Sequence, residues 1–171
     1  GRATSLRNRE RSYFAPDIAE KRSPWIAKML REVKGIDFKK TDSVLEAILL
    51  EADLIKKFKP PYNTDLKDDK SFNYVVITKE ELPKVIVVRG RVLEKYKGSV
   101  FGPYTNGRQL REALKIVRRI FPFIDDSSSK KQNYQFYKQI GLTPDTKAPS
   151  ELYLSNIKYL KLFFAGKKKS V

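Results

Sequence analysis

The segment 44–58 constrains this chain more than any other, because it predicts one long amphipathic helix. Ser43, with Glu46 three residues later, has the spacing of a capping box, in which each side chain satisfies a free backbone amide. Pro60 and Pro61 follow the segment, and prolines are typical of the residues just beyond a helix C-terminus. The sequence therefore predicts a helix of about four turns with defined ends.

One side of this helix carries a carboxylate where an apolar side chain would be expected. Successive helical residues are about 100° apart. Four apolar residues therefore share one stripe: Val44, Ile48, Ile55 and Phe58. Glu51 falls in the middle of that stripe, and a carboxylate among aliphatic groups is costly unless a metal or an arginine pairs with it. Glu51 is therefore either a residue at a solvated edge or a functional group, and its surroundings favour a functional group.

The balance of charge indicates a polyanionic partner. The 171 residues carry a formal net charge of +16, from 36 Lys+Arg against 20 Asp+Glu. Such an excess is most often a footprint for nucleic acid, and the alternatives are a solubility effect or an anionic membrane surface. No apolar stretch approaches the roughly 20 residues that span a bilayer, and no signal peptide is recognisable. The charge and the class of the protein alone lead us to expect a cytoplasmic location.

The chain contains no Cys and no His, which excludes several kinds of chemistry. Disulfides, thiolate or imidazole metal sites, iron–sulfur clusters, cysteine nucleophiles and histidine bases are all ruled out. Any metal must be held by oxygen, which favours Mg²⁺ or Mn²⁺. A general base must be Tyr, Lys, Glu, Asp or water.

Periodicity and turn residues predict an α+β protein. We expect further helices over 2–14 (capped by Thr4 or Ser5), 17–29, 106–121, 134–140 and 151–165, and strands over 33–40, 72–78, 84–93 and 99–101. These elements divide into a first module (1–70) that holds a small sheet with flanking helices, a β-hairpin or meander with a covering helix (71–123), and a helical tail (124–171). In helix 106–121 the spacing turns Leu110, Ala113, Leu114, Val117 and Ile120 to the core, and Arg108, Arg111, Lys115, Arg118 and Arg119 to solvent.

Four residues could together hydrolyse a phosphodiester with a hard metal. That reaction needs a carboxylate for the ion, a cation for the charge that develops on phosphate, and a group that manages the attacking water. Glu51 fits the first role and Arg9 the second. Tyr13, four residues after Arg9 and on the same helix face, could act as base or orienting group. Asn63 could position a ligand or fix the loop after the helix.

Several ordered blocks resemble the GIY-YIG nuclease family. Gly1-Arg2-Ala3 followed by Leu6-Arg7-x-Arg9-x-Arg11-Ser12-Tyr13 resembles the stretch that begins at the last glycine of that motif, and 46–63 resembles the next block. Blocks at 66–71, 89–91 and 101–104 are similar to one branch in particular, the incising component of the bacterial nucleotide-excision-repair excinuclease. Other GIY-YIG nucleases would not be expected to carry blocks 66–71 and 101–104. The resemblance covers 1–123 and, more loosely, 134–169.

The resemblance implies a nuclease module that makes the 3′-side incision at a lesion in double-stranded DNA. It would use Mg²⁺ or Mn²⁺ after the other two excinuclease components have marked the damage. By motif match, Glu51 would bind the metal, Arg9 would stabilise phosphate, and Tyr13 and Asn63 would complete the site. A solvated face explains any single basic residue, but collectively we expect DNA contacts from Arg2, Arg7, Arg11, Lys56, Lys57, Lys59, Lys67, Lys70, Arg89 and Arg91.

Three departures from the family pattern limit this interpretation. The two motif tyrosines and their strands would precede Gly1, so we expect that the polypeptide alone does not cleave DNA and that part of the Glu51 helix stays uncovered. The family's cysteine cluster has no counterpart in 134–150, so we expect no iron–sulfur centre. The chain stops at Val171, before the family's second nuclease half and its element for binding a partner component of the excinuclease. Two alternatives stay open: a stand-alone GIY-YIG nuclease, and a non-catalytic nucleic-acid-binding module.

Overall fold

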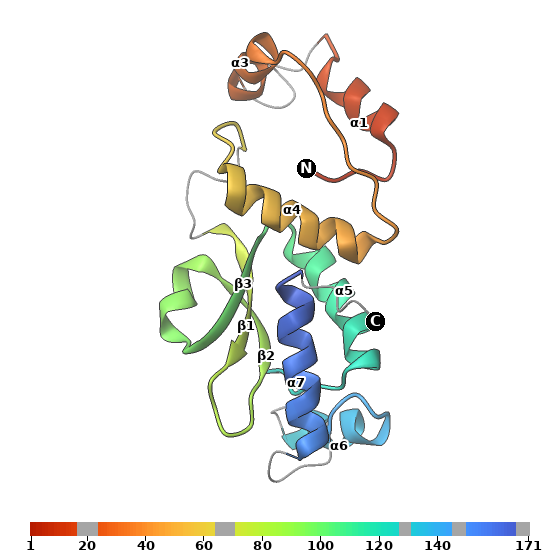
Figure 1. The fold of residues 1–171 in the computed structure, drawn as a ribbon, viewed down its shortest axis with the longest axis vertical. Coiled ribbons are helices and arrows are strands. Elements are labelled where there is room, and N and C mark those ends of the chain that lie inside the picture. Colours follow the sequence, from red (N-terminus) through yellow and green to blue (C-terminus); the bar gives the residue numbers. More distant parts are fainter. Residues whose placement is uncertain (17–23, 64–70, 127–130, 145–149, 167–171) are drawn as a thin grey trace.

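Three antiparallel strands, with helices packed on one face of them, form the centre of the molecule (Figure 1). The computed structural model describes residues 1–16, 24–63, 71–126, 131–144 and 150–166. The strands are β1 (Asn73–Thr78), β2 (Val85–Arg89) and β3 (Gly98–Tyr104). The helices are α1 (Leu6–Tyr13), α3 (Pro24–Glu32), α4 (Val44–Phe58), α5 (Gly107–Ile120), α6 (Lys131–Gln139) and α7 (Glu151–Phe164), with a 3₁₀ helix, η3, over Gly90–Lys95. The predicted α+β class is confirmed.

The sheet has the strand order β2-β1-β3, and both pairings are antiparallel. Val75 of β1 pairs with Val87 on one side and with Phe101 on the other. The predicted hairpin is therefore confirmed, but β3 returns to the free edge of β1 rather than continuing a meander. The predicted strand 84–93 is too long, because Arg89 already pairs with Asn73, the first residue of β1, and the chain beyond it turns into η3.

Alternation along β1 gives the sheet two buried faces. Val75 and Ile77 belong to the main core, which is shared with residues of α4, α5 and α7. Val76, from the other face, packs with Ile86 and Val88 in a smaller cluster that Val92 and Leu93 of η3 cover. Both faces are thus covered, which explains why β1 is almost continuously buried.

The helices begin at the caps that the sequence offers. The Ser43 side chain accepts from the Glu46 amide at 3.1 Å, and the Glu46 carboxylate accepts from the Asp42 amide at 3.2 Å. Ser5 caps α1, so Ser5 rather than Thr4 is the cap residue. The predicted helices 106–121, 134–140 and 151–165 are confirmed as α5, α6 and α7. The predicted helix 17–29 is described only from Pro24, and it extends to Glu32.

The predicted strand 33–40 is wrong. These residues form no strand, and Ile36 and Phe38 are 62% and 66% exposed. A strand needs a neighbour for its backbone hydrogen bonds, and none of the three described strands lies in residues 1–63. The β-branched and aromatic content of this segment is therefore a misleading signal.

Four predictions of side-chain burial also fail. Val44 and Phe58 lie at the first and last positions of α4, and they are 63% exposed because the core contacts the middle of the helix. Ile120, the last residue of α5, is 65% exposed for the same reason. Arg118, predicted to face solvent, is buried at 6% exposure. Its hydrogen-bond partners, Leu142, Asp125 and Thr143, come from outside α5.

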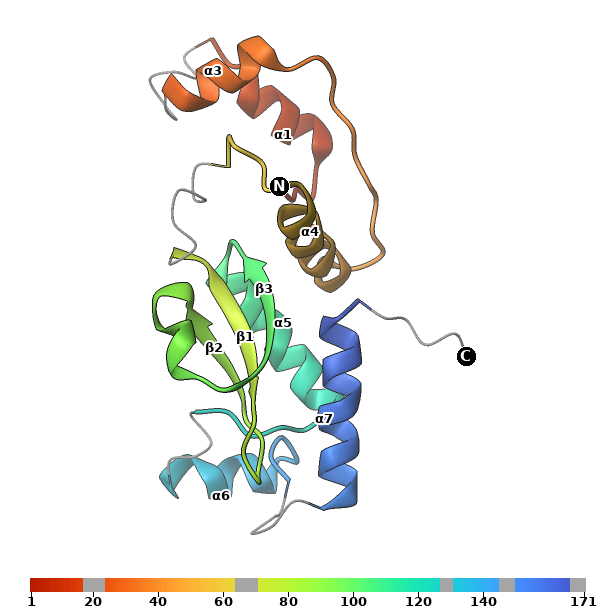
Figure 2. The same ribbon diagram turned by 60° about the vertical axis from the view of Figure 1, so that its left-hand side comes forward.

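Helices α1 and α3 form a separate layer on the side of α4 that faces away from the sheet (Figures 1 and 2). The segment between α3 and α4 connects this layer to the rest of the chain. Among the described residues, none of the helices has the length and apolar character that crossing a membrane requires. The space between the upper layer and α4 is where the candidate site lies.

Candidate functional site

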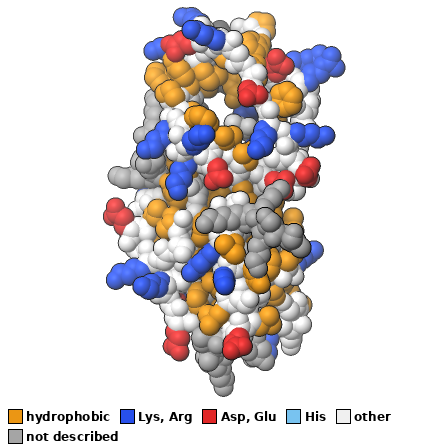
Figure 3. Space-filling view, viewed as in Figure 1, with side chains coloured by type: hydrophobic (Ala, Val, Ile, Leu, Met, Phe, Trp, Pro, Cys, Tyr) orange, Lys and Arg blue, Asp and Glu red, His pale blue; other side chains and the backbone are white. Residues whose placement is uncertain are grey.

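A wide groove separates α1 from α4, and it extends along the whole length of α4 to the turn that follows the helix. It has a volume of about 1310 Å³, and residues 37–44 form one wall. In the space-filling view the surface is hollowed at this position (Figure 3). Arg9, Tyr13, Glu51 and Asn63, the four predicted catalytic residues, all line this groove. The fold therefore gathers residues that are up to 54 positions apart in the sequence on the walls of one cavity, with Asn63 beyond the C-terminal end of α4.

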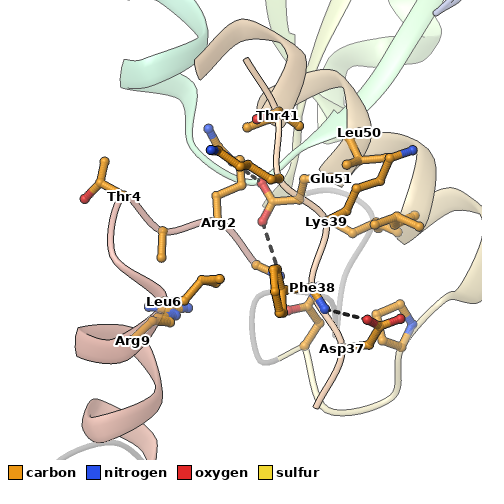
Figure 4. Close-up of a pocket in the computed structure, with 18 of the residues that line it drawn as sticks. Arg2, Thr4, Leu6, Arg9, Asp37, Phe38, Lys39, Thr41, Leu50 and Glu51 are labelled. Carbon is orange, nitrogen blue, oxygen red and sulfur yellow. Dashed lines mark hydrogen bonds and ion pairs between the residues drawn. The ribbon is translucent and has the colours of Figure 1, made fainter. Parts of the chain in front are cut away.

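Glu51, which lines this groove, is held by two hydrogen-bond donors. Its side chain is 11% exposed, and its Oε2 accepts from Arg2 Nε at 2.5 Å and from Thr105 Oγ1 at 3.1 Å. The Gly1 backbone nitrogen lies 3.8 Å from Oε1. Figure 4 shows Glu51 and Arg2 facing one another, with Phe38 from the opposite wall beside them. Glu51 is therefore not a solvated edge residue, because the cost of burying its charge is offset by specific partners.

Arg9 and Tyr13 form a second pair on α1. Arg9 Nη2 donates to the Tyr13 hydroxyl at 3.0 Å, and the guanidinium lies 5.0 Å from the centre of the tyrosine ring. Gly1 lies between this pair and Glu51. A Cβ on Gly1 would be 3.2 Å from Arg9 Nη2 and 4.0 Å from Glu51 Oε1, so the missing side chain leaves room for both groups to approach. The two pairs are thus parts of one site.

The turn after α4 places Asn63. Lys59 ends the helix with a φ of 42°, and the Asn63 amide donates to the Pro60 carbonyl at 3.3 Å. Trp25 braces this turn by donating to the Pro61 carbonyl at 3.3 Å, and its ring lies 5.2 Å from that of Tyr62. The hydrogen bond from Tyr62 to the Glu32 carboxylate raises the pKa of the tyrosine.

The Glu51 carboxylate suits a hard cation that takes a single carboxylate ligand from the protein. Within the described ranges there is no group of three or more His, Cys, Asp or Glu that could hold an ion. Mg²⁺ is commonly bound by one or two carboxylates, with waters and substrate phosphates completing its shell. Oε2 is engaged by Arg2 and Thr105, and Oε1 has only the more distant Gly1 nitrogen as an ion-pair partner among the described contacts. The residues therefore fit a hydrated Mg²⁺ or Mn²⁺ ion that needs phosphate to complete its coordination.

The predicted DNA contacts do not form one patch. Arg2 is engaged with Glu51, and Arg89 donates to the Ser71 carbonyl at 2.6 Å. The remaining predicted DNA-contact residues that the structure describes are exposed. They lie on α1 (Arg7, Arg11), at the end of α4 (Lys56, Lys57, Lys59) and on η3 (Arg91). Lys67 and Lys70 lie outside the described residues. Lys and Arg side chains are spread over the face in Figure 3 rather than gathered on it.

Sequence reasoning misses two residues that line the groove and one that bonds Glu51 from outside its lining. Lys39 and Lys40 line it, and their adjacent charges are a visible signal, but they lie in the segment for which composition predicts a strand. Thr105 bonds Glu51 across 54 residues, and no spacing rule connects positions that far apart. The only hint for Thr105 is that it directly follows the 101–104 block.

Comparison with known proteins identifies relatives. Residues 1–64 match the family described as the UvrC-like GIY-YIG domain. The chain is 38% identical over 178 residues to UvrABC system protein C of Thermoanaerobacter sp. (strain X514), covering 98% of this chain and 28% of the relative. It is 43% identical over 123 residues to that of Microcystis aeruginosa (strain NIES-843 / IAM M-2473), covering 71% and 19%. The Actinobacillus succinogenes protein is 33% identical over 178 residues, covering 100% and 28%. The chain thus spans less than a third of these relatives, and no solved structure matches it.

Proposed function

Because residues 1–64 of this chain belong to the UvrC-like GIY-YIG domain family, we propose that the chain is the nuclease-bearing part of a UvrC-type protein of nucleotide excision repair. Its reaction would be metal-dependent hydrolysis of a phosphodiester on the 3′ side of a DNA lesion. The observation that carries this proposal is the burial of Glu51 against Arg2 in a groove that Arg9 and Tyr13 also line. A carboxylate, two arginines and a tyrosine are the groups that such a reaction requires.

Each residue has a distinct role in this proposal. Glu51 would hold Mg²⁺ or Mn²⁺, which when bound would supply Lewis-acid stabilisation of the charge developing on phosphate. Arg9, on the opposite wall, would neutralise the same charge from the protein side. Tyr13, fixed by its hydrogen bond from Arg9 at 3.0 Å, would orient the attacking water. Asn63 would position the DNA strand or the loop beside it.

The DNA partner would be double-stranded and damaged, and it would be held mainly through its phosphates. Exposed basic residues on α1, α4 and η3 lie on separate parts of the surface, which suits contacts to backbone rather than to base edges. The excinuclease component UvrB, a further partner implied by the family, would bind through regions that this chain does not contain. We expect a cytoplasmic protein that, as this chain alone, does not cut DNA.

An incision assay on a chimera tests the proposal. This chain would replace the matching segment of the Thermoanaerobacter relative, and a duplex with one site-specific adduct would be the substrate. We expect Mg²⁺-dependent incision on the 3′ side of the adduct that requires UvrA and UvrB. The 171-residue chain alone is the matched comparison, and efficient Glu51-dependent cutting by it would contradict the proposed inactivity.

The same assay separates the alternatives. A stand-alone GIY-YIG nuclease would cut undamaged duplex without UvrA and UvrB. A non-catalytic binding module would bind the duplex but leave the chimera inactive under every condition. Either result would replace the proposed function.

A further inference from the structure

We infer that Thr105 is a positioning residue for Glu51: its hydroxyl holds one carboxylate oxygen, so that the other is presented to a hydrated divalent cation. This inference rests on the proposed function, because it concerns the same carboxylate. It assigns a task to a residue outside the family's nuclease domain, which ends at residue 64. Thr105 is instead placed by the sheet and by α5.

The backbone on both sides of Thr105 is anchored. Tyr104, the last residue of β3, pairs with Asn73 of β1 and is 4% exposed. Asn106 caps α5, and its side chain accepts from the Gln109 amide at 3.0 Å. The junction between the β1–β3 strand pair and a capped helix therefore fixes the backbone at Thr105. Because β3 also packs against α4, the hydroxyl faces the helix that carries Glu51.

The two donors to Glu51 come from different parts of the fold. Arg2 belongs to the N-terminal segment before α1, whereas Thr105 follows β3. Both bond Oε2, at 2.5 Å and 3.1 Å. An arginine alone sits on a flexible stem and can follow a rotating carboxylate. A second donor from a rigid junction restricts that rotation and leaves Oε1 as the oxygen for a cation.

A purely structural role for Thr105 makes a different prediction. If the hydroxyl only offsets the burial of Glu51, its removal lowers stability but leaves cation affinity unchanged. If the hydroxyl orients the carboxylate, its removal weakens cation binding as well. Removing a residue that hydrogen-bonds a metal ligand typically lowers the affinity for the metal about 10- to 100-fold. Metal affinity therefore distinguishes the two roles without any measurement of activity.

The experiment measures Mn²⁺ binding to the 171-residue chain by water-proton relaxation. The variants are Thr105→Val, which keeps shape and removes the hydroxyl, Thr105→Ala in parallel, and Thr105→Ser, which keeps the hydroxyl. Glu51→Gln defines the background binding. Thr143→Val is the matched control, since Thr143 is also hydrogen-bonded but contacts Arg118, away from the groove. We expect Thr105→Val and Thr105→Ala to bind Mn²⁺ about 10-fold more weakly, with Thr105→Ser near native and Thr143→Val unchanged.

The outcomes separate this inference from the function on which it rests. Native affinity in Thr105→Val and Thr105→Ala, together with loss in Glu51→Gln, would overturn the role of Thr105 alone. Equal binding by the native chain and Glu51→Gln would overturn the metal assignment of Glu51 and this inference with it. Weak binding by Thr105→Ser would also count against the role, because the hydroxyl would then not be the group that matters.

Discussion

Replacement of Arg118 by Met should destabilise the chain strongly, although sequence periodicity places this residue on the solvent side of α5. Its guanidinium lies among five partners from outside the helix. Nε donates to the Leu142 carbonyl at 2.9 Å, Nη1 to Asp125 at 2.8 Å and Nη2 to Thr143 at 2.8 Å, while the rings of Phe123 and Tyr137 lie 5.2 Å and 4.6 Å from the guanidinium carbon. This cluster ties α5 to the segment 134–144.

The expected cost follows from these contacts. Methionine keeps much of the apolar stem but leaves the Leu142 carbonyl and the Thr143 hydroxyl without their charged donor, at about 1.5 kcal/mol each. Asp125 loses its ion-pair partner but is 27% exposed, so water can solvate it and the added cost is small. The lost ring contacts bring the total to about 3–4 kcal/mol. For a chain of 171 residues this corresponds to a Tm lower by roughly 6–16 °C.

Thermal and urea unfolding followed by circular dichroism measure this effect. Arg119→Met is the matched control, because Arg119 is the exposed neighbour on the same helix and should change stability by less than about 0.5 kcal/mol. Equal Tm values for the two variants would refute the reasoning. A separate expectation, the absence of an iron–sulfur centre, would be contradicted by iron or absorbance near 400 nm in the purified protein.

Three further predictions concern the sheet, the core and DNA. Gly98→Ala should lower the free energy of unfolding by at least about 2 kcal/mol in a urea titration, because the new Cβ would lie 2.1 Å from the Ile77 carbonyl oxygen. Gly35→Ala is the control: a Cβ there would have nothing within 4 Å, so the same titration should show no change. Burial raises the pKa of Tyr153 to about 12 and also raises that of Tyr104. The folded state therefore favours the protonated phenols. The free energy of unfolding should keep its full value below pH 10 and fall as the pH rises through 12. In Tyr153→Phe the fall should be less steep. Duplex affinity, measured by fluorescence anisotropy, should drop about 10³-fold between 50 and 200 mM salt if some six phosphates are contacted, and salt-independent binding would contradict a phosphate-tracking surface.

Local signals in the sequence are sufficient for most of the fold. Helix α4, its Ser43 cap and the turn after it follow from periodicity and capping chemistry, which act within a few residues. The β1–β2 hairpin is equally local. The segment 33–40 shows the limit of such signals, because a strand exists only if another strand lies beside it, and composition does not report that neighbour.

The site is predictable where its residues share an element and not where they meet across the fold. Arg9 and Tyr13 are one turn apart on α1, and their contact follows from the spacing. Glu51 stands out because it interrupts an apolar stripe. The bond from Thr105 to Glu51 joins residues that are 54 positions apart. The burial of Arg118 depends on a segment beyond α5. Helical periodicity carries no information about either contact.

The most direct test of the proposed site is the 3′-incision rate of the chimeric protein when Glu51 is replaced by Gln. Asp53→Asn is the matched control, because Asp53 is an exposed carboxylate two residues further along the same helix. We predict that Glu51→Gln lowers the Mg²⁺-dependent rate at least about 100-fold, corresponding to the several kcal/mol that a bound metal supplies, while Asp53→Asn stays near native. Incision at a native rate by a folded Glu51→Gln protein would contradict the central claim that Glu51 is the metal-binding carboxylate of this site.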